Sequence, residues 1–307
     1  KKVEELMSKE EVTKRVDEEV KEVSTYYNKA KHYTSIWGSG NIHFGCFDFL
    51  PKTMEIDAVY QKYCNNITLS ELDYETACEN VTYNMCDIAN INTTSVVLDF
   101  GCGFGKPSHD IYRKYNPKTI TGIDISQKNI TYANDNYYIK DKIEYYIDSF
   151  TNVSNDNVLK YKGHYTHVFS QAAICHCHDT IDLVFENAFK MLKDNGYFII
   201  LDCLSNTQAD SLTKQYVYQR MKFKYLISST EYIKKLNNNG FKILNVINMD
   251  HHFYLSYKIL SQRSKNVGNY PLSLSYENTC KAIKNNQYNM YVILAQKTPQ
   301  KQIQSRL

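Results

Sequence analysis

Acidic residues and glycines gather where two expected strands end. Val96 to Leu98 is an apolar run of the kind that forms a buried parallel strand, and Asp99 follows it closely. Glycine then occupies every second position, at Gly101, Gly103 and Gly105. Because glycine has no Cβ atom, this backbone can turn sharply and lie against a ligand. The spacing predicts a loop that holds a small molecule at the end of the first strand.

The segment after the glycines completes a nucleotide-binding unit. Ser108 to Tyr115 is helix-like, and a second apolar run, Ile120 to Ile123, ends at Asp124. A carboxylate at this position can accept hydrogen bonds from both hydroxyls of a ribose, so Asp124 indicates an adenosine-type ligand. Lys106 stands where the dinucleotide fingerprint requires its third glycine, so NAD fits poorly. The acid at the mouth of the loop, Asp99, would repel a pyrophosphate and suits a cationic ligand without phosphates.

The spacing Asp99-x-Gly101-x-Gly103-x-Gly105 resembles motif I of the class I S-adenosylmethionine-dependent methyltransferases. The resemblance implies S-adenosyl-L-methionine as the cofactor and S-adenosyl-L-homocysteine as the product. It also implies that Asp99 lies near the methionyl ammonium and that the cofactor-binding residues include Asp124 and the next residue, Ile125. A glycine-rich turn that holds no ligand is the alternative for the loop.

A second likeness lies ahead of this unit, in the aromatic segment 26–47. This segment contains the single tryptophan of the chain, then a glycine turn and the triplet His43-Phe44-Gly45. It resembles the segment ahead of the core in the branch with the glycine, sarcosine and dimethylglycine N-methyltransferases and the tocopherol methyltransferases. In that branch the segment covers the cofactor and touches the acceptor, and aromatic faces attract cationic groups. The resemblance implies two catalytic candidates, Tyr26 and Tyr33, and two further lid residues, Trp37 at the cofactor and His43. The alternative is an aromatic seam that packs a helix on the sheet.

The third expected strand, Ile143 to Ile147, ends in Asp148-Ser149-Phe150. In the family this junction holds the adenine: an acid or a backbone group binds the exocyclic amine, and apolar atoms cover the ring. The resemblance therefore adds Asp148, Ser149 and Phe150 to the cofactor-binding candidates. For Asp148, an ordinary strand-end acid that caps the following turn is the alternative.

The fourth expected strand, Tyr165 to Ser170, leads into alternating cysteines and histidines at positions 175–178. Neighbouring side chains point apart and no second ligand pair is evident, so we predict no metal site. The stretch resembles the family motif at this strand end, which implies that Ser170, Gln171 and His176 face the transfer site. His176 could orient the acceptor or act as a general base near neutral pH, and a structural histidine is the alternative. We expect His178 at the surface.

The order of these elements predicts an α/β fold. The resemblance implies a Rossmann-like, seven-stranded, doubly wound sheet with an antiparallel last strand. We expect a helical N-terminal lid segment at residues 1–90, a cofactor-binding core at 91–297 and a frayed tail at 298–307. Residues 250–289 are too many for a hairpin connection and predict a cap insertion. In it His251, Tyr254 and Tyr257 could contact the acceptor, or belong to a surface helix.

The composition limits the partners. The chain has 307 residues, with 36 Lys and Arg against 33 Asp and Glu, so there is no basic field that would mark a nucleic-acid-binding protein. Nine cysteines lack the spacing of a disulfide framework, and the apolar runs are too short to span a bilayer. We expect a cytoplasmic monomer or homodimer without nucleic-acid partner or stable membrane insertion. The sequence does not begin with methionine, so a missing presequence is the alternative for location.

The function that these observations favour is methyl transfer to a small-molecule acceptor. Likeness to the glycine-to-betaine branch favours an amine nitrogen. One alternative is a C- or O-methyltransferase for a larger apolar acceptor, such as a prenylated quinol, a sterol or a polyketide. The other is a cofactor-binding scaffold without catalysis. A pocket with Arg or Lys favours an amino-acid substrate, and a long apolar tunnel favours the larger acceptor.

Overall fold

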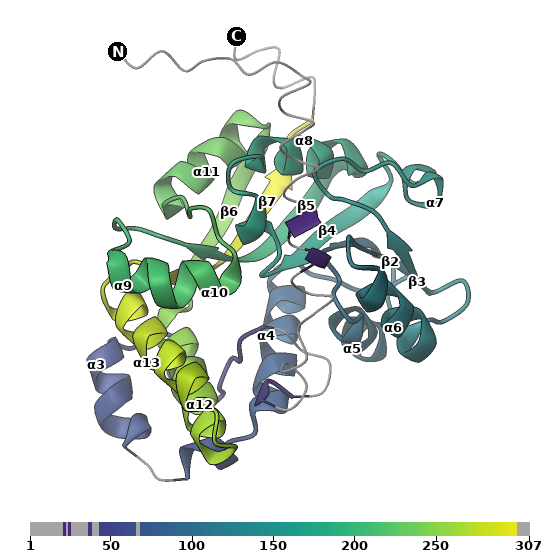
Figure 1. Cartoon of the computed structure of the whole chain (residues 1–307). Coiled ribbons are helices and arrows are strands. Elements are labelled where there is room, and N and C mark those ends of the chain that lie inside the picture. Colours follow the sequence, from purple (N-terminus) through teal and green to yellow (C-terminus); the bar gives the residue numbers. More distant parts are fainter. Residues whose placement is uncertain (1–20, 23, 26–35, 39–42, 66–67, 300–307) are drawn as a thin grey trace, which may run out of the picture.

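A computed structural model describes residues 21–22, 24–25, 36–38, 43–65 and 68–299 (Figure 1). Its centre is a seven-stranded sheet with the order β3-β2-β1-β4-β5-β7-β6. The strands are β1 (Val96–Phe100), β2 (Thr119–Asp124), β3 (Ile143–Ile147), β4 (Tyr165–Gln171), β5 (Leu192–Leu204), β6 (Phe241–Asn248) and β7 (Asn289–Lys297). Strands β1 to β5 run parallel to one another, and β7 is antiparallel to both β5 and β6. The expected Rossmann-like sheet with an antiparallel last strand is confirmed.

Helices cover both faces of the sheet (Figure 1). The longer ones are α4 (Tyr74–Ile88), α5 (Lys106–Tyr115), α6 (Gln127–Tyr137), α8 (Ile181–Met191), α11 (Ser229–Asn238), α12 (Asp250–Asn266) and α13 (Tyr270–Lys284). The short ones are α3 (Ile56–Val59), η1 (Tyr60–Cys64), η2 (Leu69–Glu71), α7 (Asp156–Leu159), η3 (Ile174–Cys177), α9 (Ser211–Thr213), η4 (Lys214–Tyr218) and α10 (Gln219–Met221). None of the helices in the described ranges is both long and apolar enough to cross a lipid bilayer.

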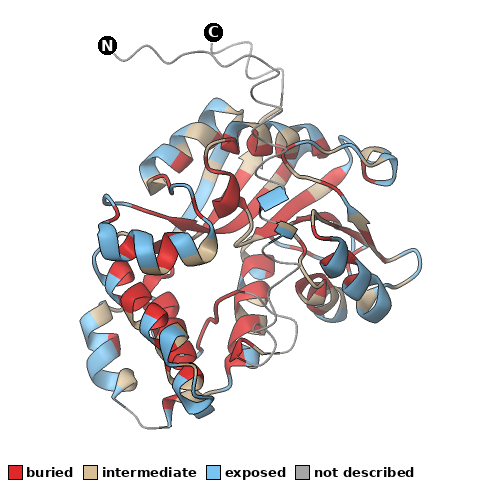
Figure 2. Cartoon of the chain, viewed as in Figure 1, coloured by how far each residue is buried: buried red, intermediate tan, exposed pale blue. Residues whose placement is uncertain are grey.

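The central strands are buried on both sides, as Figure 2 shows. Successive side chains of a strand point to opposite faces. Val97 therefore packs with the cluster under α4, α5, α6, α12 and α13, and its neighbour Leu98 packs with the cluster under α7, α8 and α11. This explains why the sequence shows continuous apolar runs in these strands rather than an alternating pattern. All nine cysteines are free thiols.

Helices α12 and α13 form the segment predicted as a cap insertion. The carboxylate of Asp250, at the start of α12, accepts bonds from the backbone N–H of Met290 and from the side-chain amides of Asn248 and Asn289, all at 2.8 Å. These bonds tie the end of β6 and the start of β7 to the first turn of the helix. Most of α12 is buried, so the surface-helix alternative is wrong. The start of α12 is therefore held in place beside β6 and β7 by these hydrogen bonds.

Candidate active site

The glycine loop joins β1 to α5 at the carboxyl ends of the parallel strands, where ligands bind in sheets of this type. Its three glycines have φ angles of 76°, 54° and 84°, a region that side chains rarely adopt. A Cβ atom on Gly101 would lie 2.4 Å from Ala173 Cβ, and one on Gly105 would lie 2.8 Å from Ala133 Cβ. A Cβ atom on Gly103 would meet nothing within 4 Å. Packing therefore requires the outer glycines, whereas the central one borders open space.

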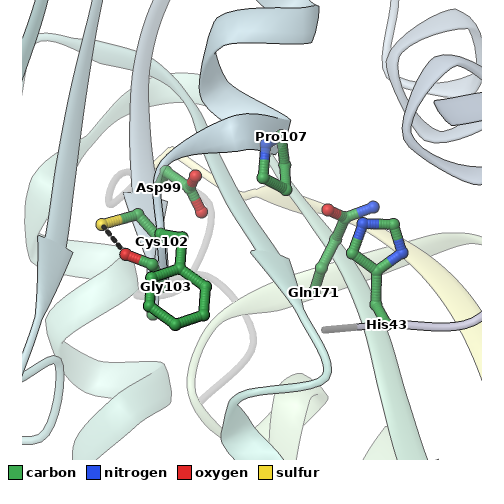
Figure 3. Close-up of a pocket in the computed structure, with 8 residues that line it drawn as sticks. His43, Asp99, Cys102, Gly103, Pro107 and Gln171 are labelled. Carbon is green, nitrogen blue, oxygen red and sulfur yellow. Dashed lines mark hydrogen bonds between the residues drawn. The ribbon is translucent and has the colours of Figure 1, made fainter. Parts of the chain in front are cut away.

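That open space is a pocket between the glycine loop and the segment that precedes α4 (Figure 3). The lining residues come from this segment, the loop, the start of α5 and the end of β4, and they include His43, Asp99, Cys102, Gly103, Pro107 and Gln171. In Figure 3 the side chains of His43 and Gln171 lie on the opposite side of the pocket from Asp99 and Cys102. The predicted cofactor loop thus faces a predicted lid residue across one cavity.

Asp124, at the end of β2, is bonded directly to the loop. The backbone N–H of Gly103 donates to its Oδ2 at 3.0 Å, and the N–H of Ser126 donates to its Oδ1 at 2.8 Å. Asn129 Nδ2 donates to the same Oδ1 at 3.3 Å. Burial raises the pKa of Asp124, while these bonds favour its charged form. A carboxylate has about four lone-pair positions, so Asp124 can still accept a ligand hydroxyl. Ile125, which follows it, is half-buried.

Asp99 is 2 % exposed and lines the same pocket. Ser108 Oγ, on α5, donates to its Oδ2 at 2.6 Å. Burial raises the pKa of Asp99 to about 7, the Ser108 bond opposes this rise, and the charge of Asp124 adds to it. The carboxyl group is therefore partly protonated near neutral pH. A cation placed beside it would favour the charged form.

His43 lines the pocket, and its two ring nitrogens have different surroundings. Its Nδ1 lies 3.1 Å from the carbonyl oxygen of Phe44, so Nδ1 carries the proton and Nε2 is an acceptor. Nε2 is buried and has no hydrogen-bond partner among the described residues. Burial lowers the pKa of His43 to about 4; the bond to Phe44 opposes this and the charge of Lys106 reinforces it. The imidazole is therefore neutral at physiological pH.

The end of β4 carries two predicted cofactor residues. Ser170 is fully buried, and its hydroxyl donates to the carbonyl oxygen of Phe100 at 3.0 Å, inside the sheet. Gln171 lines the pocket, and its Nε2 donates to Thr82 Oγ1 on α4 at 3.0 Å. Gln171 therefore lies at the cavity, whereas the Ser170 side chain ties β4 to β1.

His176, the predicted catalytic histidine, lies on η3 directly after β4. Its ring centroid is 5.2 Å from that of Phe223, and burial lowers its pKa to about 4, so it is neutral but a weak base near neutral pH. Asp202 holds this turn: it accepts from the N–H of Cys175 at 2.9 Å, and its Oδ2 lies 3.3 Å from His178 Nε2. The surface position expected for His178 is wrong, because this bond and the packing around it bury the ring. The role of His176 stays a prediction.

The junction after β3 is built around Asp148. Its carboxylate accepts from the N–H groups of Ser149 at 2.9 Å, Ser154 at 3.1 Å and Asn155 at 3.0 Å. Asp148 thus caps the following turn, the structural arrangement that the sequence left open. The Phe150 ring lies 3.4 Å from the position of a Cβ on Gly101, beside the glycine loop. Contacts of Asp148, Ser149 and Phe150 with adenine stay predictions.

Trp37 lies in an aromatic cluster with the cap. Its Nε1 donates to the Tyr276 hydroxyl at 2.9 Å, and its ring centroid is 6.2 Å from that of Tyr257. Phe44, next to His43, is 5.3 Å from the same Tyr257 ring. Trp37 is not among the lining residues of the pocket described above. Its contact with a cofactor stays a prediction, and the aromatic seam that we considered as the alternative is present.

The remaining candidates have different positions. Tyr26 and Tyr33 lie outside the described residues. His251 is buried with its Nε2 3.1 Å from the carbonyl oxygen of Pro51, and Tyr254 is buried in the cap. No group of three or more His, Cys, Asp or Glu side chains in the described part of the chain is arranged to hold a metal ion.

Sequence analysis did not identify Arg220, on α10. Its Nε donates to Ser275 Oγ at 2.9 Å and its Nη2 to Thr279 Oγ1 at 3.0 Å. Its guanidinium carbon lies 5.6 Å and 4.9 Å from the ring centroids of Tyr257 and Tyr276. Within the described ranges, no carboxylate lies within salt-bridge distance of this half-buried cation. No motif marks Arg220 among the eleven residues from α9 to α10, and only its long-range contacts with α12 and α13 show that it is a half-buried cation.

Comparison with known proteins defines the class. A family model for a methyltransferase domain matches residues 70–246, more than half of the chain, so the chain belongs to that family. It is an S-adenosylmethionine-dependent methyltransferase, as motif I predicted. A search of curated protein sequences finds no match.

Solved structures with the same fold act on different acceptors. One is a protein from Galdieria sulphuraria that is named as a sarcosine dimethylglycine methyltransferase, with 17 % identity, a TM-score of 0.70 and coverage of 89 % of this chain and 98 % of that one. The geranyl diphosphate C-methyltransferase of Streptomyces coelicolor has 13 % identity, a TM-score of 0.72 and coverage of 91 % and 98 %. A phosphoethanolamine N-methyltransferase of Haemonchus contortus has 16 % identity, a TM-score of 0.69 and coverage of 90 % and 60 %. At these identities the likeness shows the fold alone.

A side chain at Gly103 should block cofactor binding without unfolding the protein. The substitution Gly103→Val would fill the open side of the loop, and its backbone strain should cost about 1–2 kcal/mol. Gly163→Val is a matched control, because Gly163 also has a positive φ and open space around its Cβ position. We expect titration calorimetry to show that Gly103→Val no longer binds S-adenosylhomocysteine and that Gly163→Val binds normally. Unchanged affinity of Gly103→Val would refute the assignment of the loop.

Cofactor affinity should rise with pH up to about 7 and then level off. Asp99 must ionise to pair with an ammonium group, and burial raises its pKa to about 7, so binding below that pH releases a proton. In the free protein, protonated Asp99 favours the folded state at low pH, and this contribution is lost as the pH rises toward 7. Calorimetry with S-adenosylhomocysteine from pH 5.5 to 7.5, in two buffers of different ionisation enthalpy, measures the proton release. Asp99→Asn should abolish the pH dependence; the same slope in both proteins would contradict this role.

Proposed function

We propose that this enzyme methylates the amine nitrogen of a small acceptor that also carries an acidic group, as glycine, sarcosine and dimethylglycine do. The observation that carries this proposal is Arg220, a half-buried guanidinium without a carboxylate partner among the described residues. The hydrogen bonds and ring contacts of Arg220 leave its charge without a counter-ion among the described residues, and a bound anion would stabilise this partly desolvated cation. The planar guanidinium fits a carboxylate or a phosphate with two parallel hydrogen bonds.

The surroundings of Arg220 connect it to the expected transfer site. Phe223, three residues further along the same segment, contacts the ring of His176. On the other side, Tyr257 contacts both the guanidinium of Arg220 and the ring of Phe44, which follows His43. Tyr257 thus links the guanidinium to the residue after His43, and the ring that contacts His176 lies three residues further along the segment of Arg220. An acceptor whose acidic end reaches Arg220 would have its amine on the side of the histidines.

The relatives by fold support the same class of acceptor. Sarcosine and phosphomonomethylethanolamine, which appear in the names of two of these structures, are both amines with an anionic group. An anionic group on the acceptor would match the charge of Arg220.

The residues of the site fit the cofactor that the family uses. Gly103 leaves open space, Asp124 can accept a ribose hydroxyl, and Asp99 offers an acceptor for the methionyl ammonium. When bound, S-adenosylmethionine supplies a methyl group on a positively charged sulfur. The protein's own contribution is mainly to position the acceptor in line with that group, which can supply a large part of the acceleration. A general-base role for His176 stays a prediction, because burial lowers its pKa to about 4 and makes it a weak base. The buried residues of α12 would keep water away from the dispersed charge.

A C-methyltransferase for an apolar acceptor is the second candidate. The wall of the cap is mainly aromatic, with Trp37, Phe253, Tyr257 and Tyr288 all buried in one cluster. A prenyl chain would pack well against such a surface. The geranyl diphosphate methyltransferase also combines an apolar chain with an anionic group, so Arg220 is compatible with this candidate.

A panel of acceptors with labelled methyl donor distinguishes these functions. We expect methylation of amines with a carboxylate or phosphate, and no methylation of uncharged quinols or sterols. In Arg220→Met the KM for the acidic acceptor should rise at least about tenfold, the effect of losing one charge-assisted hydrogen bond. Arg113→Met, a change at an exposed position on α5, is the control and should leave KM unchanged.

Three results would contradict the proposal. Methylation of a prenyl diphosphate in place of amines would favour the second candidate. Unchanged KM in Arg220→Met would remove the role of the guanidinium. Binding of S-adenosylmethionine without any turnover across the panel would support a scaffold without catalysis.

A further inference from the structure

His43 Nε2 is a buried hydrogen-bond acceptor without a partner in the part of the chain that the structure describes. His43 is 3 % exposed, and its Nε2 has no hydrogen-bond partner among the described residues. Its Nδ1 faces the carbonyl oxygen of Phe44 at 3.1 Å, which assigns the proton to Nδ1 and leaves a lone pair on Nε2. An unsatisfied buried polar atom costs about 1–3 kcal/mol, so it calls for a ligand that donates an N–H or an O–H.

Side chains on both sides of the pocket offer hydrogen-bond acceptors. Asp99 presents a carboxyl group, and only one bond to it, from Ser108, comes from a side chain. Gln171 Oε1 accepts only the long bond from Thr82 Oγ1, at 3.4 Å. These acceptors surround one cavity, and an ammonium group has three hydrogens to donate. The ligand group that fits is therefore a primary ammonium.

The nearest lysine does not supply this ammonium. Lys106 Nζ is bonded to Glu79 Oε1 at 2.8 Å and to Asp110 Oδ2 at 2.6 Å. These bonds, to one acid on α4 and one on α5, use two of the three donors of the lysine, and Nζ makes no hydrogen bond to His43 Nε2. We therefore look for the donor to Nε2 in a bound molecule.

We propose that His43 binds the methionyl ammonium of the cofactor, accepting one of its N–H hydrogens at Nε2. This inference rests on the proposed function. It assigns His43 to the cofactor rather than to the acceptor, because the pocket is formed by the glycine loop and not by the aromatic cap around Arg220. His43 is thus a ligand-binding residue that selects the amino-acid part of the donor.

Two ligands that differ in the amino-acid part test this assignment by binding alone. S-adenosylhomocysteine carries the ammonium, whereas 5′-methylthioadenosine has the same adenosine and thioether without it. We expect titration calorimetry to show that His43→Phe lowers the affinity for S-adenosylhomocysteine at least about tenfold. Its affinity for 5′-methylthioadenosine should change by less than about twofold. His43→Gln places an amide oxygen near the position of Nε2 and should restore most of the affinity.

The controls separate this role from a structural one. His167 on β4 is also buried, with its Nε2 2.9 Å from the carbonyl oxygen of Ala89, at the end of the strand away from the pocket. His167→Phe should leave the ratio of the two affinities unchanged. If the larger ring of phenylalanine prevents folding, His43→Leu takes the place of His43→Phe and is judged by the same ratio of the two affinities.

The outcomes also distinguish this inference from the proposed function. Equal weakening of both ligands, or no weakening of either, would overturn the role of His43 while the enzyme class stands. If the substitution changed only the KM for the acceptor, His43 would bind the acceptor and not the cofactor, which would also overturn the inference. A wild-type protein that binds neither ligand would contradict the proposed function and this inference together.

Discussion

The site depends on the hydrogen bond from the backbone N–H of Gly103 to Asp124. This bond joins the end of β2 to the loop after β1, so the acid and the open glycine have a fixed relative position before any ligand arrives. The positive φ angles of all three loop glycines and the close packing of Gly101 and Gly105 restrict the conformation of the loop. A ligand that fits here finds its binding groups already arranged, which reduces the entropy that binding must overcome.

Charge divides the interior into two regions. Around the glycine loop, Asp99, Asp124 and the neutral His43 offer acceptors and negative charge, which suits the cationic donor. In the cap the half-buried charge is positive, at Arg220, and aromatic rings surround it. The cationic methyl donor would therefore bind at the glycine loop, and an acceptor with an anionic group would bind beside Arg220. The cap stays in place because Asp250 ties α12 to the strands on either side of the insertion.

Much of this arrangement could be predicted from local patterns. The glycine spacing and the acid after the second apolar run are local sequence patterns, and the antiparallel last strand was implied by the family resemblance. The burial of His178 could not, because Asp202, its partner, is 24 residues away. Arg220, in the segment from α9 to α10, was missed for a similar reason. No local pattern in that segment singles it out, and its contacts are with α12 and α13, which lie far away in the sequence. Long-range pairing decided what single segments could not show.

The central claim is that the first two strand ends bind the adenosyl part of S-adenosylmethionine. A crystal structure of the protein with S-adenosylhomocysteine tests it most directly. The account predicts electron density for the ribose hydroxyls at Asp124 and for the homocysteine chain across the open face of Gly103. Density for the ligand elsewhere, or no ligand density beside Asp124 and Gly103 at saturating ligand, would contradict it.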